Sequence, residues 1–180
     1  MPAYNYPVSL IPDDDAQRLL SLYQCGMLDT PEEESFDRVA RLAALIFNAP
    51  ASFINFVDER RVFFKSNNSN FPTRSIDRKD SLCSLTILKN EPTVFEDTHA
   101  IPQLLASPYV SCEGGIRFYA GAPLIMPDGH RVGTVCVIDS EPRLIIPRQL
   151  QMLETLSHVI TEKLILQMTI SKMEKSSLRN

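Results

Sequence analysis

Apolar positions recur every three or four residues in two stretches near the start of the chain, which is the spacing of amphipathic helices. The first stretch begins with three consecutive aspartates and ends at Gly26, a residue that suits the left-handed position just after a helix. In the second stretch, Thr30, Pro31 and Glu33 have the order of a capping box with proline in the first turn. They predict a helix that begins at Thr30 and ends near Phe47.

A third helical pattern begins at Pro147 and continues to about Lys175. A helix of that length would extend about 40 Å at 1.5 Å per residue, which is more than a small domain can cover. Leu166, Ile170 and Met173 follow the spacing of a two-helix seam. We therefore expect the end of this helix to pack against the same helix of a second copy in a homodimer.

Between the helices, continuous apolar runs predict strands that are covered on both faces of a sheet. The predicted strands are 51–57, 61–66, 93–96, 116–126 and 131–138. Asp-Gly between the last two predicts a hairpin, and Gly133 inside a strand marks a place of close packing. The remaining segments are two helical stretches, 81–88 and 102–106, and two surface loops, 67–80 and 107–115. This order of elements predicts an α+β domain with a mainly antiparallel sheet.

Composition disfavours several classes of protein. The 180 residues are 44% hydrophobic with a net charge of −4, and no basic run interleaves with aromatic residues, so we expect no nucleic-acid binding. No stretch approaches the ~18 apolar residues of a membrane span, and no signal peptide is evident, so we expect a cytoplasmic protein. The four cysteines lack the spacing of metal ligands, which predicts reduced thiols and no metal site.

Several motifs resemble those of GAF domains, the small-molecule-sensing modules of many signalling proteins. The most specific are RFYAGAPL at 117–124 and DGHRVGTVCVID at 128–139, and LDTPEE at 28–33 and FVDER at 56–60 extend the match. The resemblance covers about residues 16–156. It implies a sheet of five or six strands, with the terminal helices on one face and a ligand cavity on the other.

The resemblance also sets the expected boundaries of the domain. A GAF domain would occupy 12–161, between a flexible tail at 1–11 and a helical extension at 162–180. Signalling would pass through the C-terminal helix to a downstream domain or a partner protein.

Arg117 is the most informative candidate for the ligand site. It opens a buried strand, where a charge must be paired or must bind something. Its guanidinium could clamp a carboxylate or phosphate, or it could pair with Asp97, Asp139 or a backbone carbonyl. The two-residue period of a strand puts Tyr119 on the same face as Arg117. Asp97 follows a short strand, where it suits an Asx-turn, the rim of the expected cavity, or both.

The other candidates are a thiol and two rings. Cys83 lies near a predicted helix N-terminus, which would lower the pKa of its thiol, or it is a small buried apolar residue. Phe64 and Phe95 are either cavity walls or plain core. The predicted ligand-binding residues are Arg117, Tyr119, Asp97, Cys83, Phe64 and Phe95.

Two kinds of thiol chemistry known in GAF proteins find little support. Cysteines that attach linear tetrapyrroles are typically followed by histidine, whereas Ser84 follows Cys83. Cys112 resembles in position the mobile cysteines of free methionine sulfoxide reductase, but that family's several-cysteine pattern is missing.

We therefore predict a non-catalytic sensory domain that binds an unidentified small molecule and signals through the C-terminal helix of a dimer. One alternative is a dimerisation or docking module whose cavity is filled by side chains. Another is a thiol-based redox enzyme that uses Cys83 or Cys112. The sequence contains no phosphate loop or nucleophilic signature and identifies no cofactor.

Overall fold

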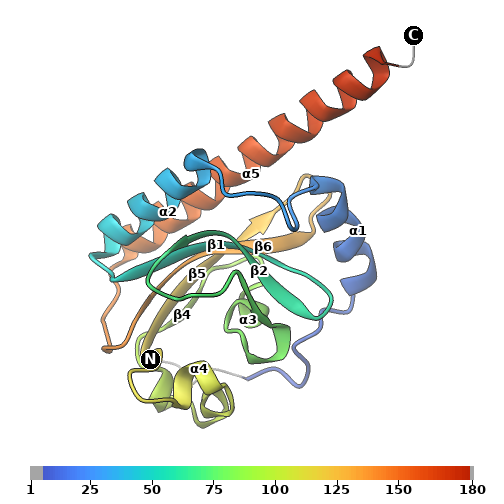
Figure 1. The fold of residues 1–180 in the computed structure, drawn as a ribbon. Helices are drawn as coiled ribbons and strands as arrows, with labels where there is room; N and C mark the ends of the chain where they lie inside the picture. The colour runs from blue at the N-terminus through green and yellow to red at the C-terminus, as the bar shows by residue number, and fades with distance from the viewer. Residues whose placement is uncertain (1–5, 179–180) are drawn as a thin grey trace.

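An antiparallel sheet forms the middle layer of the molecule, in a computed structural model that describes residues 6–178 (Figure 1). Within that range the sheet has six strands in the order β3-β2-β1-β6-β5-β4, and every neighbouring pair is antiparallel. The strands are β1 (Ala51–Val57), β2 (Arg61–Asn68), β3 (Ser75–Asp77), β4 (Thr93–Phe95), β5 (Phe118–Ile125) and β6 (Arg131–Asp139). The predicted α+β class is confirmed.

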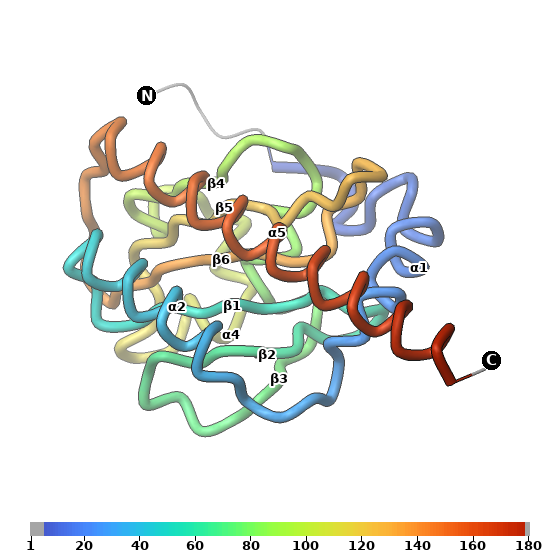
Figure 2. The backbone as a smooth tube through the Cα atoms, turned by 90° about the horizontal axis from the view of Figure 1, so that it is seen from above, coloured from blue at the N-terminus to red at the C-terminus, as the bar shows by residue number. Residues whose placement is uncertain are grey.

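Three long helices cover one face of the sheet. Helices α2 (Glu34–Phe47) and α5 (Pro147–Ser177) lie side by side across it, and α1 (Asp15–Cys25) packs at one end of the same face (Figures 1 and 2). Gly26 ends α1 in the left-handed conformation, with φ of 64°, as predicted. In residues 6–178, no helix is both long and apolar enough to cross a membrane.

Short elements cover the opposite face. They are the α-helices α3 (Cys83–Thr86) and α4 (Pro108–Ser111) and the 3₁₀-helices η1 (Arg78–Asp80), η2 (Thr98–Ala100) and η3 (Pro102–Ala106). The predicted loops at 67–80 and 107–115 therefore contain a short strand, β3, and helical turns. These pieces are too short to show a period in the sequence.

The sheet separates two apolar clusters, as strand alternation requires. On β5, Phe118 and Ala120 face the long helices, whereas Tyr119 faces the short elements. Of the predicted flexible tail at 1–11, residues 1–5 lie outside the described residues, and Tyr6 and Leu10 pack against the second cluster.

The predicted capping box at Thr30 is wrong, because α2 begins at Glu34. The Thr30 hydroxyl donates to the carbonyl of Met27 at 2.7 Å and accepts from the Nζ of Lys65 at 2.7 Å. The carboxylate of Glu33 also binds Lys65 instead of a backbone N–H. The buried ammonium group of Lys65 thus binds the oxygens of Thr30 and Glu33 that were predicted to cap the helix.

The predicted hairpin of β5 and β6 is confirmed, with Gly129 in its turn at φ of 87°. Gly133 pairs with Phe56 of β1 and Leu124 of β5, at the centre of the sheet. A Cβ built on Gly133 would lie 1.9 Å from the backbone oxygen of Asn55. The predicted close packing at this glycine is therefore an approach of one strand backbone to another.

We expect Gly133→Ala to lower the free energy of unfolding by about 3 kcal/mol, because β1 and β6 must separate to admit the methyl group. Urea denaturation followed by circular dichroism measures this change. Gly129→Ala is the matched control, since its Cβ would meet open space and its cost is that of positive φ, about 1 kcal/mol. Equal losses in the two variants would contradict the steric explanation.

Candidate functional site

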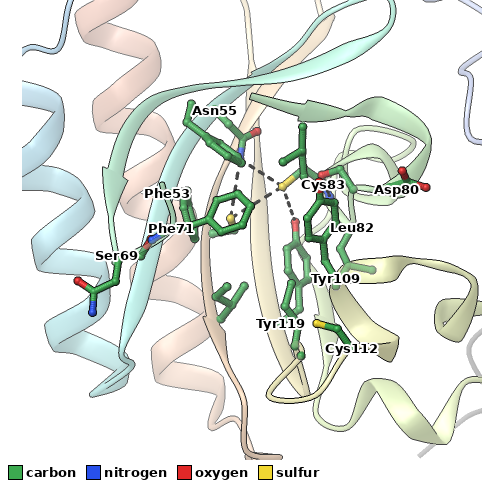
Figure 3. A pocket seen from close by; sticks show the side chains of 18 of the residues that line it. Phe53, Asn55, Ser69, Phe71, Asp80, Leu82, Cys83, Tyr109, Cys112 and Tyr119 are labelled. Carbon is green, nitrogen blue, oxygen red and sulfur yellow. Dashed lines mark hydrogen bonds between the residues drawn. The ribbon is translucent and has the colours of Figure 1, made fainter. Parts of the chain in front are cut away.

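A cavity of about 380 Å³ lies on the sheet face opposite the long helices (Figure 3). Strands β1, β2, β5 and β6 supply one wall, and the segments 69–72, 80–83 and 109–116 supply the others. The second apolar cluster continues into these walls. This volume lies in the range of small-molecule pockets.

A series of aromatic contacts crosses from the sheet to the two covering loops. The rings of Phe53 and Phe64 are 5.0 Å apart between centroids, and Phe71 meets Phe64 edge-on at 6.1 Å. Phe71 also meets Tyr109 edge-on at 5.8 Å, so the two loops touch through rings. These side chains give the cavity faces on which a flat apolar molecule can pack.

Polar groups gather at the inner end of the cavity, on α3 and the central strands (Figure 3). The amide Nδ2 of Asn55 donates to the Sγ of Cys83 at 3.2 Å, and the Tyr119 hydroxyl donates to the same sulfur at 3.6 Å. The Sγ of Cys136 lies 3.9 Å from that of Cys83. The hydroxyls of Tyr119 and Thr86 are 2.7 Å apart.

These contacts make the two thiols unequal. A hydrogen bond from Cys136 and one from Tyr119 lower the pKa of Cys83 to about 6, against the opposing effect of burial. The hydrogen bond with Cys83 and burial together raise the pKa of Cys136 well above its usual value. Burial also raises the pKa of Tyr119, so its hydroxyl remains a donor at neutral pH.

Three of the six predicted ligand residues line the cavity: Cys83, Tyr119 and Phe64. Phe95 does not. It is buried behind Tyr119, with ring centroids 5.9 Å apart, and belongs to the core. The sequence pattern could not separate these two roles for a buried ring.

The prediction that Arg117 and Asp97 line the cavity is wrong. The Nε and Nη2 of Arg117 donate to the two carboxylate oxygens of Asp97 at 2.9 and 2.8 Å. Asp97 also accepts from the backbone N–H of His99, which is the Asx-turn that the sequence suggested. Each of the paired side chains is about one-third exposed, at 31% and 34%, and the guanidinium is held at the sheet edge.

Sequence reasoning missed several residues of the site. The sequence offered a signal for Asn55, because it is the one amide in the mostly apolar strand 51–57. The signal for Cys136 was weaker: alternation along β6 places it on the face opposite Val135 and Val137, which is the cavity face. Phe71 and Tyr109 lie in segments without periodicity, and no local pattern indicated their direction.

An ionic cluster connects β2 to the helices on the other face of the sheet. The buried Nζ of Lys65 lies 2.7 Å from the Oε1 of Glu33 and donates to the carbonyl of Pro31 at 2.6 Å. Gln167 of α5 donates to the Oε2 of Glu33 at 2.9 Å, and the Nζ of Lys163 lies 3.5 Å from it. Although burial opposes it, hydrogen bonds from Lys65 and Gln167 lower the pKa of Glu33.

Metal binding finds no support in the described part of the chain. Residues 6–178 contain no group of three or more His, Cys, Asp or Glu side chains placed to hold an ion.

Comparison with known proteins gives a family and a relative. The family model of the GAF domain matches residues 31–163. The cyclic di-GMP phosphodiesterase PA2567 of Pseudomonas aeruginosa is 32% identical over 154 residues. The match covers 85% of this chain and 26% of that protein, so the chain spans about a quarter of the relative's length.

Solved structures share the fold at low sequence identity. The GAF domain of a phosphoenolpyruvate-protein phosphotransferase from Acinetobacter has a TM-score of 0.62 at 16% identity, covering 86% of this chain and 95% of that one. A free methionine-R-sulfoxide reductase from Neisseria meningitidis has a TM-score of 0.60 at 16% identity, covering 91% and 96%. The second GAF domain of DevS from Mycobacterium smegmatis has a TM-score of 0.58 at 13% identity, covering 78% and 97%. The fold supports the family model, and this chain belongs to the GAF domain family.

Proposed function

We propose that this chain is a non-catalytic sensory domain that binds a small, neutral and largely apolar molecule and transmits its binding to α5. The observation that carries the proposal is the cavity itself, about 380 Å³ with aromatic walls and polar groups at one end. Pockets of this kind hold small molecules through apolar contact and orient them through a few hydrogen bonds.

The charges around the cavity favour a neutral ligand. Among the described residues that line it, Asp80 is the one acidic side chain, and no lysine or arginine is present. An anion would therefore enter an apolar site without a counterion, at a high cost in desolvation. Because Arg117 is paired with Asp97 outside the lining, it does not relieve that cost.

Two adjacent residues of β2 offer a route for the signal. Phe64 lines the cavity, and Lys65 faces the opposite side, where it binds Glu33. Glu33 in turn contacts Gln167 and Lys163 of α5. A ligand that displaces the Phe64 ring would move β2, and the rigid ionic contacts would pass that movement to α5.

The relative PA2567 suggests what such a signal could control. Its name states a cyclic di-GMP phosphodiesterase, and this chain matches only a quarter of its length. We propose that the chain corresponds to a regulatory segment of a signalling protein of that kind. Cyclic di-GMP itself is a poor candidate for the cavity, because its two phosphates would find no basic side chain in the lining.

A thiol-based redox enzyme is the second candidate. It is favoured by the position of Cys83 and the exposed Cys112 on the same cavity. Against it, no histidine lines the cavity among the described residues, so the commonest proton donor for a departing oxygen is missing.

The far end of α5 supports the proposed homodimer. The helix projects past the body of the domain (Figure 2), and its last buried residue is Leu164. Beyond this point Leu166, Ile170 and Met173 remain 61%, 47% and 68% exposed. Their spacing suits a seam with a second copy of the same helix.

The cavity is tested with N-phenyl-1-naphthylamine, a neutral aromatic probe whose fluorescence rises in apolar surroundings. We expect Ile138→Trp to weaken its binding at least about tenfold, because a larger side chain on β6 would occupy the cavity. Fluorescence titration measures the dissociation constant, and native mass spectrometry of the purified protein searches for a bound neutral molecule.

Arg117→Ala is the control for this experiment, since it removes a charge outside the cavity and should change the dissociation constant less than about twofold. Equal binding by wild type and Ile138→Trp would place the probe elsewhere. A loss of binding in Arg117→Ala alone would contradict the neutral site.

The absence of catalysis is tested with free methionine sulfoxide and dithiothreitol. We expect the protein to consume the sulfoxide no faster than buffer does, because no histidine in the described lining can protonate the sulfoxide oxygen as it departs. Turnover that disappears in Cys83→Ser or Cys112→Ser would overturn the sensory proposal in favour of the enzyme.

The dimer is tested by placing charge in the proposed seam. We expect wild type to have twice the mass of one chain by light scattering. The double variant Ile170→Glu, Met173→Glu should be a monomer, because each copy would bury two carboxylates at the seam. Thr169→Glu adds a carboxylate to an exposed neighbouring position and should remain a dimer. A dimer that persists in the double variant would place the interface on another surface.

A further inference from the structure

Two thiols from distant parts of the chain meet at the inner end of the cavity. Cys83 begins α3 and Cys136 lies in the central strand β6, and their sulfurs are 3.9 Å apart (Figure 3). Both side chains are buried from the outside, at 6% and 2% exposure, and both line the cavity. A small molecule that enters the cavity can therefore reach them.

We propose that Cys83 and Cys136 form an oxidant-responsive dithiol, which hydrogen peroxide entering the cavity converts to a disulfide. This goes beyond the proposed ligand binding and does not depend on it. Hydrogen peroxide needs only the space of a few water molecules, which the cavity provides.

The chemistry takes two balanced steps. In the first, the thiolate of Cys83 attacks one oxygen of the peroxide, the O–O bond breaks, and the departing hydroxide takes a proton to become water. Cys83 is then a sulfenic acid. In the second, the sulfur of Cys136 attacks that of Cys83, the S–O bond breaks, and the hydroxyl group leaves with the Cys136 proton as a second water. The two thiols lose two electrons in total, and the peroxide gains them.

The surroundings assign the two sulfurs different roles. The N–H of Asn55 at 3.2 Å and the hydroxyl of Tyr119 at 3.6 Å point at Cys83, and both stabilise negative charge on that sulfur. The lowered pKa of Cys83, about 6, agrees with this geometry and leaves it mostly ionised at neutral pH. Cys136 keeps its proton and serves as the resolving thiol.

The other cysteines lack this combination. Cys25 is buried in the opposite cluster, its thiol donates to the carbonyl of Ser21 at 3.4 Å, and burial raises its pKa to about 11. Cys112 is exposed in the segment between α4 and β5, at the rim of the same cavity. It can be oxidised from solvent, so it must be followed separately in any test.

Closing the bridge requires little movement. The sulfurs must approach from 3.9 Å to about 2.05 Å. Strand β6 is hydrogen-bonded on both sides, to β1 and β5. Helix α3 has only four residues and packs on the face of the sheet without belonging to it. We therefore expect α3 to move toward β6. Oxidation would also remove the thiolate that accepts from Asn55 and Tyr119, and so change the polar end of the cavity.

The experiment is peptide mapping of the full chain after treatment with hydrogen peroxide. Trypsin leaves each cysteine in a different peptide, with Cys83 in 80–89 and Cys136 in 132–143. Under non-reducing conditions we expect these two peptides joined, with a mass two hydrogens below their sum, and separated again by dithiothreitol. The rate of bridge formation should rise with pH around a midpoint near 6, as Cys83 ionises.

Variants identify the role of each sulfur. In Cys136→Ser, dimedone should trap a sulfenic acid on the peptide 80–89, because no resolving thiol remains. Cys112→Ser should form the bridge as wild type does, which excludes the exposed thiol as a partner. The proposal is overturned if peroxide oxidises wild type without joining 80–89 to 132–143, or if Cys83 is joined to Cys112 instead. The wild-type map decides this even where a variant fails to fold.

Discussion

Burial of the central strands on both faces constrains every polar group that they carry. The strands β1 and β6 lie inside the sheet between two apolar clusters, so a polar side chain in the middle of either strand is shielded from bulk water. Such a group must find a partner within the protein or destabilise the fold. On the cavity side, Asn55 is satisfied by the hydroxyl of Thr134 at 3.1 Å and by the sulfur of Cys83. The polar end of the cavity thus arises from the same requirement that shapes the core.

On the helix side, the same constraint acts on Lys65. Its ammonium is fully buried, and the desolvation of such a charge costs several kcal/mol, which the contacts with Glu33, Thr30 and Pro31 offset. Lys65 has no exposed side-chain surface, so removing one of its partners would leave a buried charge without compensation and destabilise the fold. These contacts explain two observations. The cluster moves the start of α2 away from the position that its own sequence favours, and it fixes α5 to β2.

The sequence predicted those features that local pattern determines. The central hairpin, the strand at 51–57 and the end of α1 at Gly26 follow from apolar runs, turn residues and a left-handed glycine. The wrong predictions, for the capping box at Thr30 and for Arg117 in the cavity, share a cause. In both, a partner that is distant in the sequence binds the side chain in the folded structure. Strand parity grouped Arg117 with Tyr119, yet Arg117 precedes β5 and its guanidinium binds the carboxylate of Asp97, which follows β4. Pattern alone gives the face of a residue and says nothing about which neighbour binds its far end.

The covering loops illustrate the other limit of sequence reasoning, and they complete the cavity. Phe71 comes from an irregular loop and Tyr109 from the four-residue helix α4, and neither segment is long enough for a period to relate one residue to the next. Their direction depends on the shape of the sheet below them. The sheet therefore determines the polar inner end of the cavity through burial, and the loops determine its outer wall through ring contacts. This division places the buried contacts of Asn55, Cys83 and Cys136 beneath the aromatic wall that Phe71 and Tyr109 form.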